Sequence, residues 1–176
     1  MRRREFLASG SLALASAAFT RPGARLKAGQ IGTAHGHADG KIETLRALDT
    51  LFEVAGVVEA DPARRERATN RAAYKGLAFL EEAPLLAMPD LALVAVETAV
   101  EELVPTARRC VAAGKHVHLD KPAGPSLPQF RSLMEEAAAR RVLVQLGYMF
   151  RYNPGFRLCF QAVKEGWIGD VIEVNG

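Results

Sequence analysis

The sequence predicts an α/β protein with a doubly wound, mostly parallel sheet. Short apolar runs alternate with amphipathic segments along most of the chain. The apolar runs lack the alternation of a sheet with one wet face, so helices are expected on both faces. A glycine-containing turn follows the first run, and a Lys-Pro pair follows a later one. Ligands bind at this carboxyl edge in open α/β sheets.

The composition is that of an ordinary globular chain. Of 176 residues, 49% are apolar and 24% are charged, which excludes wholesale disorder. The net charge of +3 is too small to indicate a nucleic-acid partner. The two cysteines, Cys110 and Cys159, form no disulfide framework and no cluster with zinc-site spacing. We expect both to be buried as small apolar residues.

In the first half of the chain, predicted strands alternate with predicted helices, as the fold class requires. A run ending in glycine predicts the first strand, and a β-branched run predicts the second. Apolar residues at every third position predict the first helix. Asp61 is suited to cap the second helix, with Pro62 in its first position. The expected strands are 26–32, 52–58 and 77–80, and the expected helices are 41–51, 62–73 and 81–88.

In the second half of the chain, predicted strands and helices alternate in the same way. Gly114 stands where a helix ends in the left-handed conformation, and Asn153 with Pro154 opens the last helix. One side of the segment before Arg141 is apolar at helical spacing. The expected strands are 91–96, 116–119, 142–146 and 171–174, and the expected helices are 101–113, 127–140 and 154–165.

The first residues resemble an export signal. Arg3 and Arg4 precede Phe6-Leu7, a small apolar stretch and an Ala-x-Ala site. The paired arginines resemble the twin-arginine signal, which carries folded proteins to the periplasm. The apolar stretch is shorter than the roughly 20 residues of a membrane span, so no integral membrane protein is expected. The alternative is an N-terminal amphipathic helix that stays on the protein. We assign 1–20 to the signal and 21–25 to a linker.

The turn after the first strand resembles a dinucleotide-binding turn with altered glycines. Such turns carry G-x-G-x-x-G, which lets the backbone approach a pyrophosphate at a helix N-terminus. In that register Gly32 is the first glycine, Ala34 replaces the second and His37 the third, while Gly36 lies one place early. The candidate cofactor-binding residues here are Gly32, Thr33, Ala34, His35 and Gly36.

The second strand is followed by a carboxylate. In this fold an acid at that point binds the adenosine ribose hydroxyls, and Glu59 occupies it. The alternative for Glu59 is a solvated charge at a strand end. Arg64 and Arg65 could hold a 2′-phosphate, but we favour a solvated helix face for both.

Two histidines lie two positions apart in the first turn. His35 and His37 would suit a metal ion, but no third ligand lies within reach in the sequence, so no metal site is predicted. We expect loop histidines near phosphate or substrate.

A second motif lies at the end of a later strand. Residues 112–122 read Ala-Ala-Gly-Lys-His-Val-His-Leu-Asp-Lys-Pro, so Lys121 follows a short strand. A lysine at this edge can polarise a substrate hydroxyl or carbonyl, and Asp120 can orient it. Pro122 fixes the turn and is a candidate for a cis peptide bond.

These motifs together resemble the Gfo/Idh/MocA family of oxidoreductases, in which Ala-Gly-Lys-His-Val is followed by Glu-Lys-Pro. Here Asp120 replaces the glutamate. The segments 54–62, 91–98, 147–154 and 166–171 also resemble family segments. The resemblance implies a Rossmann domain over 26–150 that binds NAD or NADP. It also implies a junction and the start of a truncated second α/β domain over 151–176, with only the first strand of that domain.

The resemblance also implies chemistry: hydride transfer at a carbinol carbon of a sugar or polyol, with Lys121 beside the nicotinamide. Thr98 would lie in the nicotinamide-side loop, although Ala99-Val100 replaces the family's usual residues there. Family members are about twice as long, and their second domain supplies the substrate wall. The resemblance therefore does not predict that this chain is active alone. The alternative is a truncated, non-catalytic fragment that binds nucleotide or pairs with a complementing chain, and a homo-oligomer is also conceivable.

Overall fold

The computed structural model describes residues 24–174. The strands are β1 (Leu26–Ile31), β2 (Phe52–Val58), β3 (Phe79–Leu80), β4 (Leu91–Val96), β5 (His116–Leu119) and β6 (Val144–Leu146). The helices are α1 (Ala38–Ala47), α2 (Pro62–Thr69), α3 (Glu82–Leu86), α4 (Val100–Ala112), α5 (Leu127–Arg140) and α6 (Pro154–Lys164). Two 3-10 helices are η1 (Ala72–Tyr74) and η2 (Met149–Tyr152). The predicted signal and most of the predicted linker lie outside the described residues.

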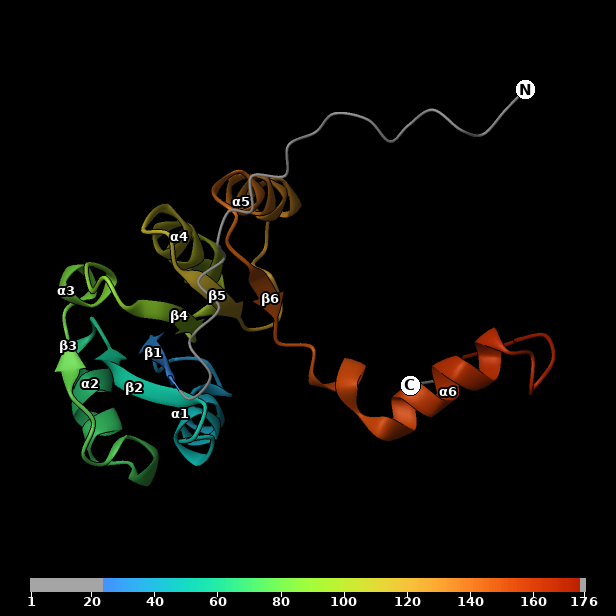
Figure 1. Ribbon diagram of the computed structural model, residues 1–176, viewed down its shortest axis with the longest axis horizontal. Helices are drawn as coiled ribbons and strands as arrows, with labels where there is room; N and C mark the ends of the chain where they lie inside the picture. The colour runs from blue at the N-terminus through green and yellow to red at the C-terminus, as the bar shows by residue number, and fades with distance from the viewer. Residues whose placement is uncertain (1–23, 175–176) are drawn as a thin grey trace.

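The sheet has six strands in the order β3-β2-β1-β4-β5-β6, and every pair is parallel (Figure 1). The order reverses between β1 and β4, so the chain winds outward from β1 in both directions. Ligands bind at such a switch point in open α/β sheets. The doubly wound parallel fold predicted from the alternating pattern is therefore confirmed.

A separate apolar cluster covers each face of the sheet. One face packs against α3, α4 and α5, with Leu85, Leu103 and Leu133 fully buried. The other packs against α1, α2 and η1 through a cluster that includes Ile42 and Tyr74. Strands covered on both faces explain why the apolar runs in the sequence are continuous.

Local signals set most of the helix boundaries. The Asp61 side chain accepts a hydrogen bond from the Arg64 N–H at 2.7 Å, which confirms the predicted cap of α2. Ser126 caps α5 in the same way. The helix expected over 62–73 is divided into α2 and η1, and the helix expected from 41 begins at Ala38.

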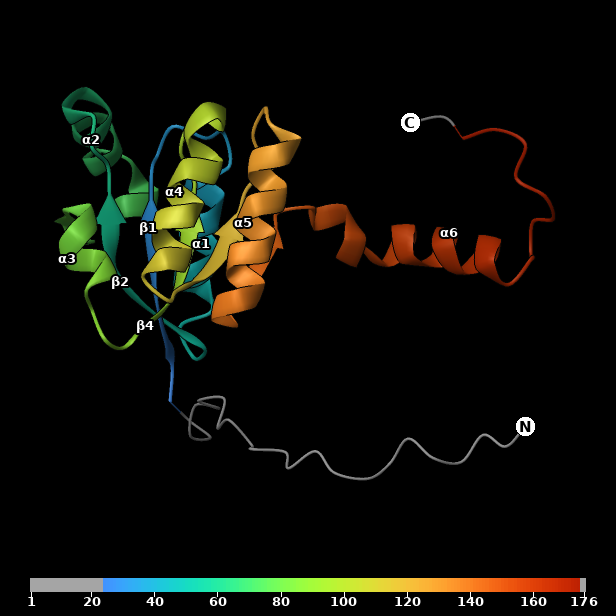
Figure 2. The same cartoon turned by 90° about the horizontal axis from the view of Figure 1, so that it is seen from above.

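The C-terminal part lies apart from the sheet. Figures 1 and 2 show α6 projecting away from the α/β body. The side chains of Phe156, Phe160 and Trp167 are exposed. The strand expected over 171–174 is not formed. This segment does not lie along either outer strand of the sheet, where a ladder could be extended (Figures 1 and 2). Cys110 is buried as expected, whereas Cys159 on α6 is exposed, so that expectation was wrong.

Among residues 24–174, no helix has the length and apolar character needed to cross a membrane.

Candidate functional site

Four residues form a row across the carboxyl ends of the central strands. The parallel ladder continues one residue past each strand. The N–H of Glu97 donates to the Ile31 carbonyl, and the N–H of Asp120 donates to the Val96 carbonyl. The N–H of Gly147 donates to the Leu119 carbonyl in the same way. Gly32 begins the row beside Glu97. Side chains in one row point to one face of a sheet, so the two acids lie side by side between two glycines.

The first turn is held tightly against β4. Gly32 has a φ of +91°, and a Cβ atom there would lie 2.6 Å from the Thr98 nitrogen. The His35 N–H donates to the Glu97 carbonyl at 3.0 Å. These contacts require glycine at the first position of the motif.

The turn leaves backbone donors available where an anion would bind. Within the described chain, no hydrogen bond occupies the N–H of Ala34 or of Gly36, and both residues are exposed at the start of α1. A Cβ atom on Gly36 would meet nothing within 4 Å. Free N–H groups and the helix dipole favour a phosphate group there. The turn therefore fits a dinucleotide pyrophosphate despite its altered glycines.

Glu59 joins the end of β2 to this turn. Its carboxylate is buried and accepts the Thr33 N–H at 2.9 Å and the Thr33 hydroxyl at 2.7 Å. It also accepts the Asp61 N–H at 3.0 Å. Burial alone would raise the pKa of Glu59, but these hydrogen bonds and the nearby Arg64 lower it below its ordinary value. Glu59 is thus not a solvated charge, and its role toward ribose stays a prediction.

We expect Glu59→Gln to destabilise the chain at pH 7 by about 1–2 kcal/mol, because an amide cannot accept all of these hydrogen bonds. A lowered pKa contributes stability that is lost as the pH falls. The difference from the wild type should therefore shrink at pH 3. Urea denaturation at both pH values measures it, and an equal difference at both would contradict the assignment.

The two arginines after Glu59 are both engaged. Arg64 donates to Glu59 at 3.2 Å, and Arg65 donates to Glu81 at 3.1 Å and to the Phe79 carbonyl at 3.0 Å. Arg64 is the one of this pair that lies beside the predicted ribose position.

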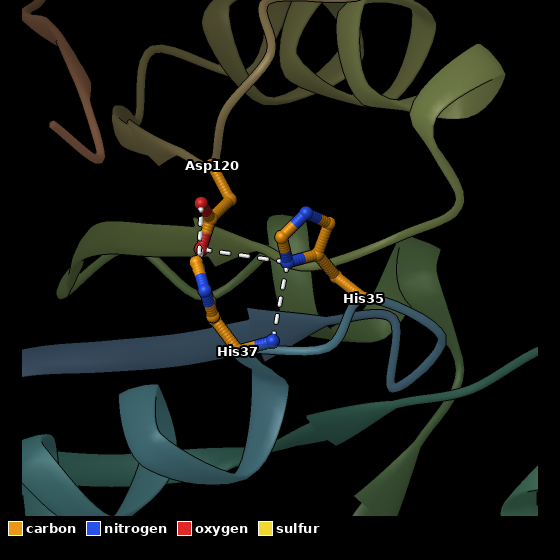
Figure 3. A group of neighbouring side chains, drawn as sticks. All are labelled: His35, His37 and Asp120. Atoms are coloured by element: carbon orange, nitrogen blue, oxygen red, sulfur yellow. Dashed lines mark hydrogen bonds and ion pairs between the residues drawn. The ribbon is translucent and has the colours of Figure 1, made fainter. Parts of the chain in front are cut away.

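The turn histidines meet Asp120 (Figure 3). Nδ1 of His37 lies 3.1 Å from Asp120 Oδ1, and Nδ1 of His35 lies 3.6 Å from Asp120 Oδ2. Nε2 of His35 lies 2.9 Å from the Lys121 carbonyl, which can only accept, so Nε2 carries the proton. Nδ1 of His35 is then unprotonated, and it accepts the His37 N–H at 3.2 Å.

Asp120 is fully buried and positions the lysine segment. Its Oδ1 accepts the Lys121 main-chain N–H at 2.6 Å, and the Lys41 ammonium lies 3.6 Å from its Oδ2. Burial would raise the pKa of Asp120, but the Lys121 N–H, His37 and Lys41 lower it. Asp120 therefore acts on the backbone of Lys121, whose exposed side chain is left available at the sheet edge.

Residues 26–148 match the family described as an oxidoreductase family with an NAD-binding Rossmann fold, Gfo/Idh/MocA. The chain belongs to this family. Inositol 2-dehydrogenase 1 of Saccharopolyspora erythraea is 31% identical over 153 residues, which are 85% of this chain and 44% of that protein. The chain thus spans less than half the length of this curated relative.

Solved structures agree with the Gfo/Idh/MocA assignment. KijD10, a 3-ketoreductase of Actinomadura kijaniata in complex with TDP-benzene and NADP, superposes with a TM-score of 0.68 at 29% identity. The match covers 84% of this chain and 46% of that one. A scyllo-inositol dehydrogenase of Lactobacillus casei with NAD(H) and scyllo-inositol shares the fold, with a TM-score of 0.70 at 20% identity. That match covers 84% of this chain and 43% of that one. The nicotinamide cofactor expected from the sequence agrees with the family's NAD-binding fold.

The sequence motifs of this Gfo/Idh/MocA chain meet at one edge. Gly32, His35, Thr98 and Lys121 all follow the carboxyl ends of β1, β4 or β5. The Lys121–Pro122 peptide bond is cis, as expected. The Thr98 hydroxyl donates to the Ala99 carbonyl at 3.2 Å, and α4 begins at the next residue. The loop after β4 is therefore short.

Sequence reasoning did not identify two residues of the site, Glu97 and His118, as functional. Glu97 is fully buried, and its carboxyl oxygens form no hydrogen bond within residues 24–174. Burial, reinforced by the neighbouring charge of Asp120, raises the pKa of Glu97 to about 9. Nε2 of His118 is likewise buried and unbonded in this part of the chain. An acid directly after an apolar strand was the available signal for Glu97.

Proposed function

We propose that this chain is the nucleotide-binding part of an NAD(P)-dependent oxidoreductase that transfers hydride to or from a sugar- or polyol-like alcohol. One observation carries the proposal: the phosphate-suited turn is joined to the lysine segment through His35 and Lys121, at 2.9 Å. The dinucleotide turn and the polarising side chain thus share one edge of the sheet. The inositol dehydrogenase relative supports the substrate class.

The side chains of this edge have separate tasks in the proposal. A bound nicotinamide would supply or accept the hydride, and the hydroxyl proton of the alcohol would be exchanged with water. The Lys121 ammonium donates a hydrogen bond to the substrate oxygen and stabilises negative charge on it. Asp120 and His35 hold the Lys121 main chain from both sides of the residue. Glu59 positions the phosphate turn and lies where ribose hydroxyls would bind.

Calorimetric titration of the purified chain with NADH and NADPH tests cofactor binding. We expect saturable binding of at least one of them. Lys121→Ala should leave this binding within about twofold, because the phosphates and ribose contact other residues. In an enzyme that also contains a substrate-binding part, the same change should lower kcat by about 100-fold or more. Absence of saturable binding to both nucleotides would refute the proposal.

The alternative is a non-catalytic fragment that binds nucleotide and pairs with a complementing chain. The exposed apolar side chains of Phe156, Phe160 and Trp167 around α6 favour pairing. The export through a twin-arginine signal also stays a proposal. Light scattering tests this pairing by measuring the mass of the complex with a second copy or a complementing chain. We expect Phe160→Ser to weaken the formation of that complex.

A further inference from the structure

Beside Asp120, which holds the Lys121 main chain, lie two side chains that the proposed hydride transfer does not use, Glu97 after β4 and His118 on β5. Atoms of Glu97, His118 and Asp120 that can bind a metal all lie within 4.8 Å of one another. Glu97 and Asp120 are fully buried. Both oxygens of Glu97 and Nε2 of His118 are buried without a hydrogen bond from residues 24–174. Buried polar atoms without partners are costly, and a bound cation would give these three side chains a common partner.

We propose that Glu97, His118 and Asp120 bind a divalent transition-metal ion of the zinc type. The inference does not depend on the proposed function, because no nucleotide takes part in it. The three ligands come from neighbouring strands: Glu97 directly follows β4, His118 lies on β5 and Asp120 directly follows β5. Strands provide the rigid support that a metal site needs.

The donor set selects the class of ion. Binding of the ion releases the Glu97 proton, and the two carboxylates then neutralise its double charge. An imidazole nitrogen beside carboxylate oxygens suits zinc and similar first-row metals better than Mg²⁺ or Ca²⁺. Nδ1 of His35 also faces this group, at 3.6 Å from the Glu97 carboxylate. This nitrogen already accepts the His37 N–H at 3.2 Å, so it is not counted among the ligands.

Gly147 provides the space for the ion. A Cβ atom there would lie 3.1 Å from Asp120 Oδ1 and 3.3 Å from His118 Nε2. Gly147 does not have a positive φ, so alanine is compatible with its backbone. A methyl group at this position would therefore obstruct the ion without removing a ligand.

One cation already lies beside the group. The Lys41 ammonium is 3.6 Å from Asp120 Oδ2, and His37 contacts the same carboxylate. A carboxylate offers about four lone-pair positions, so Asp120 can keep His37 and still bind a metal. The long Lys41 side chain can turn toward solvent when the ion binds.

Calorimetry on the full chain, treated with EDTA and carrying Cys159→Ser, tests the site. The exposed thiol is removed because it could bind zinc itself. We expect one saturable Zn²⁺ site, with Mn²⁺ weaker and Mg²⁺ undetected. Co²⁺ should give a visible spectrum that is lost when Zn²⁺ is added.

Three variants distinguish the loss of metal binding from a loss of folding. His118→Ala and Gly147→Ala should each weaken Zn²⁺ binding by at least about tenfold. His116→Ala is the matched control, because its Nδ1 accepts the Leu143 N–H at 2.9 Å and it lies outside the group. It should bind Zn²⁺ like the parent chain, and circular dichroism checks that each variant is folded. No saturable Zn²⁺ binding, equal Mg²⁺ binding, or unchanged binding by folded His118→Ala and Gly147→Ala would overturn the proposal.

Discussion

Gly32→Ala should abolish measurable binding of whichever of NADH and NADPH the parent chain binds, and lower the free energy of unfolding by about 2–4 kcal/mol. The left-handed φ of +91° disfavours any L-residue. The added methyl carbon would also lie 2.6 Å from the Thr98 nitrogen and 2.7 Å from the Glu97 carbonyl carbon. Both contacts are with backbone, so the turn itself must move. Movement of the turn would displace the donors that face the pyrophosphate. Nucleotide titration and urea denaturation measure the two effects.

Two other glycines serve as controls for Gly32. Gly36 lies in the same turn without a positive φ, and its Cβ would meet nothing within 4 Å, so Gly36→Ala should leave stability unchanged. Gly114 has a φ of +74° but the same open surroundings, so Gly114→Ala should cost only the conformational part, about 1 kcal/mol. If Gly32→Ala behaved like Gly114→Ala, the close approach to β4 would not matter.

Asp120→Ala should be the second large effect, with a loss of about 2–4 kcal/mol in the metal-free chain. The change removes the acceptor for the Lys121 N–H and for His37, and it leaves Lys41 without this counterion. The surroundings hold the pKa of Asp120 below its ordinary value despite burial, so they stabilise its charged form. Thermal or urea denaturation at pH 7 with EDTA measures the loss.

Replacement of the neighbouring acid, Glu97, should stabilise the metal-free chain, whereas replacement of Asp120 destabilises it. The pKa of Glu97 is raised from 4.5 to about 9, so the folded chain keeps a proton that the unfolded chain releases. The free energy of unfolding then falls as the pH rises between these values, by up to about 1.4 kcal/mol per pH unit. Glu97→Gln should remove this slope and stabilise the metal-free chain at pH 8. A loss at pH 8 as large as that of Asp120→Ala would show that Glu97 is charged in the folded protein.

Elements with strong local signals were predicted well. The strands 52–58, 91–96 and 116–119 and the helix 127–140 match the structure residue for residue. Their apolar runs, capping residues and helical spacing all act over a few residues, so a sequence pattern is sufficient to find them. The expected strand over 171–174 failed because a strand depends on a partner that the local pattern does not specify.

The sequence by itself determined the fold class, the two motifs and the edge of the sheet at which they meet, because strand direction in a parallel sheet places all carboxyl ends together. Only the tertiary structure decided which side chains share a row. The group that brings His35 and His37 together is Asp120, 83 residues beyond His37, and Glu97 lies beside it at the end of a third strand. Strand register sets such proximity, and register depends on packing between segments far apart in the chain.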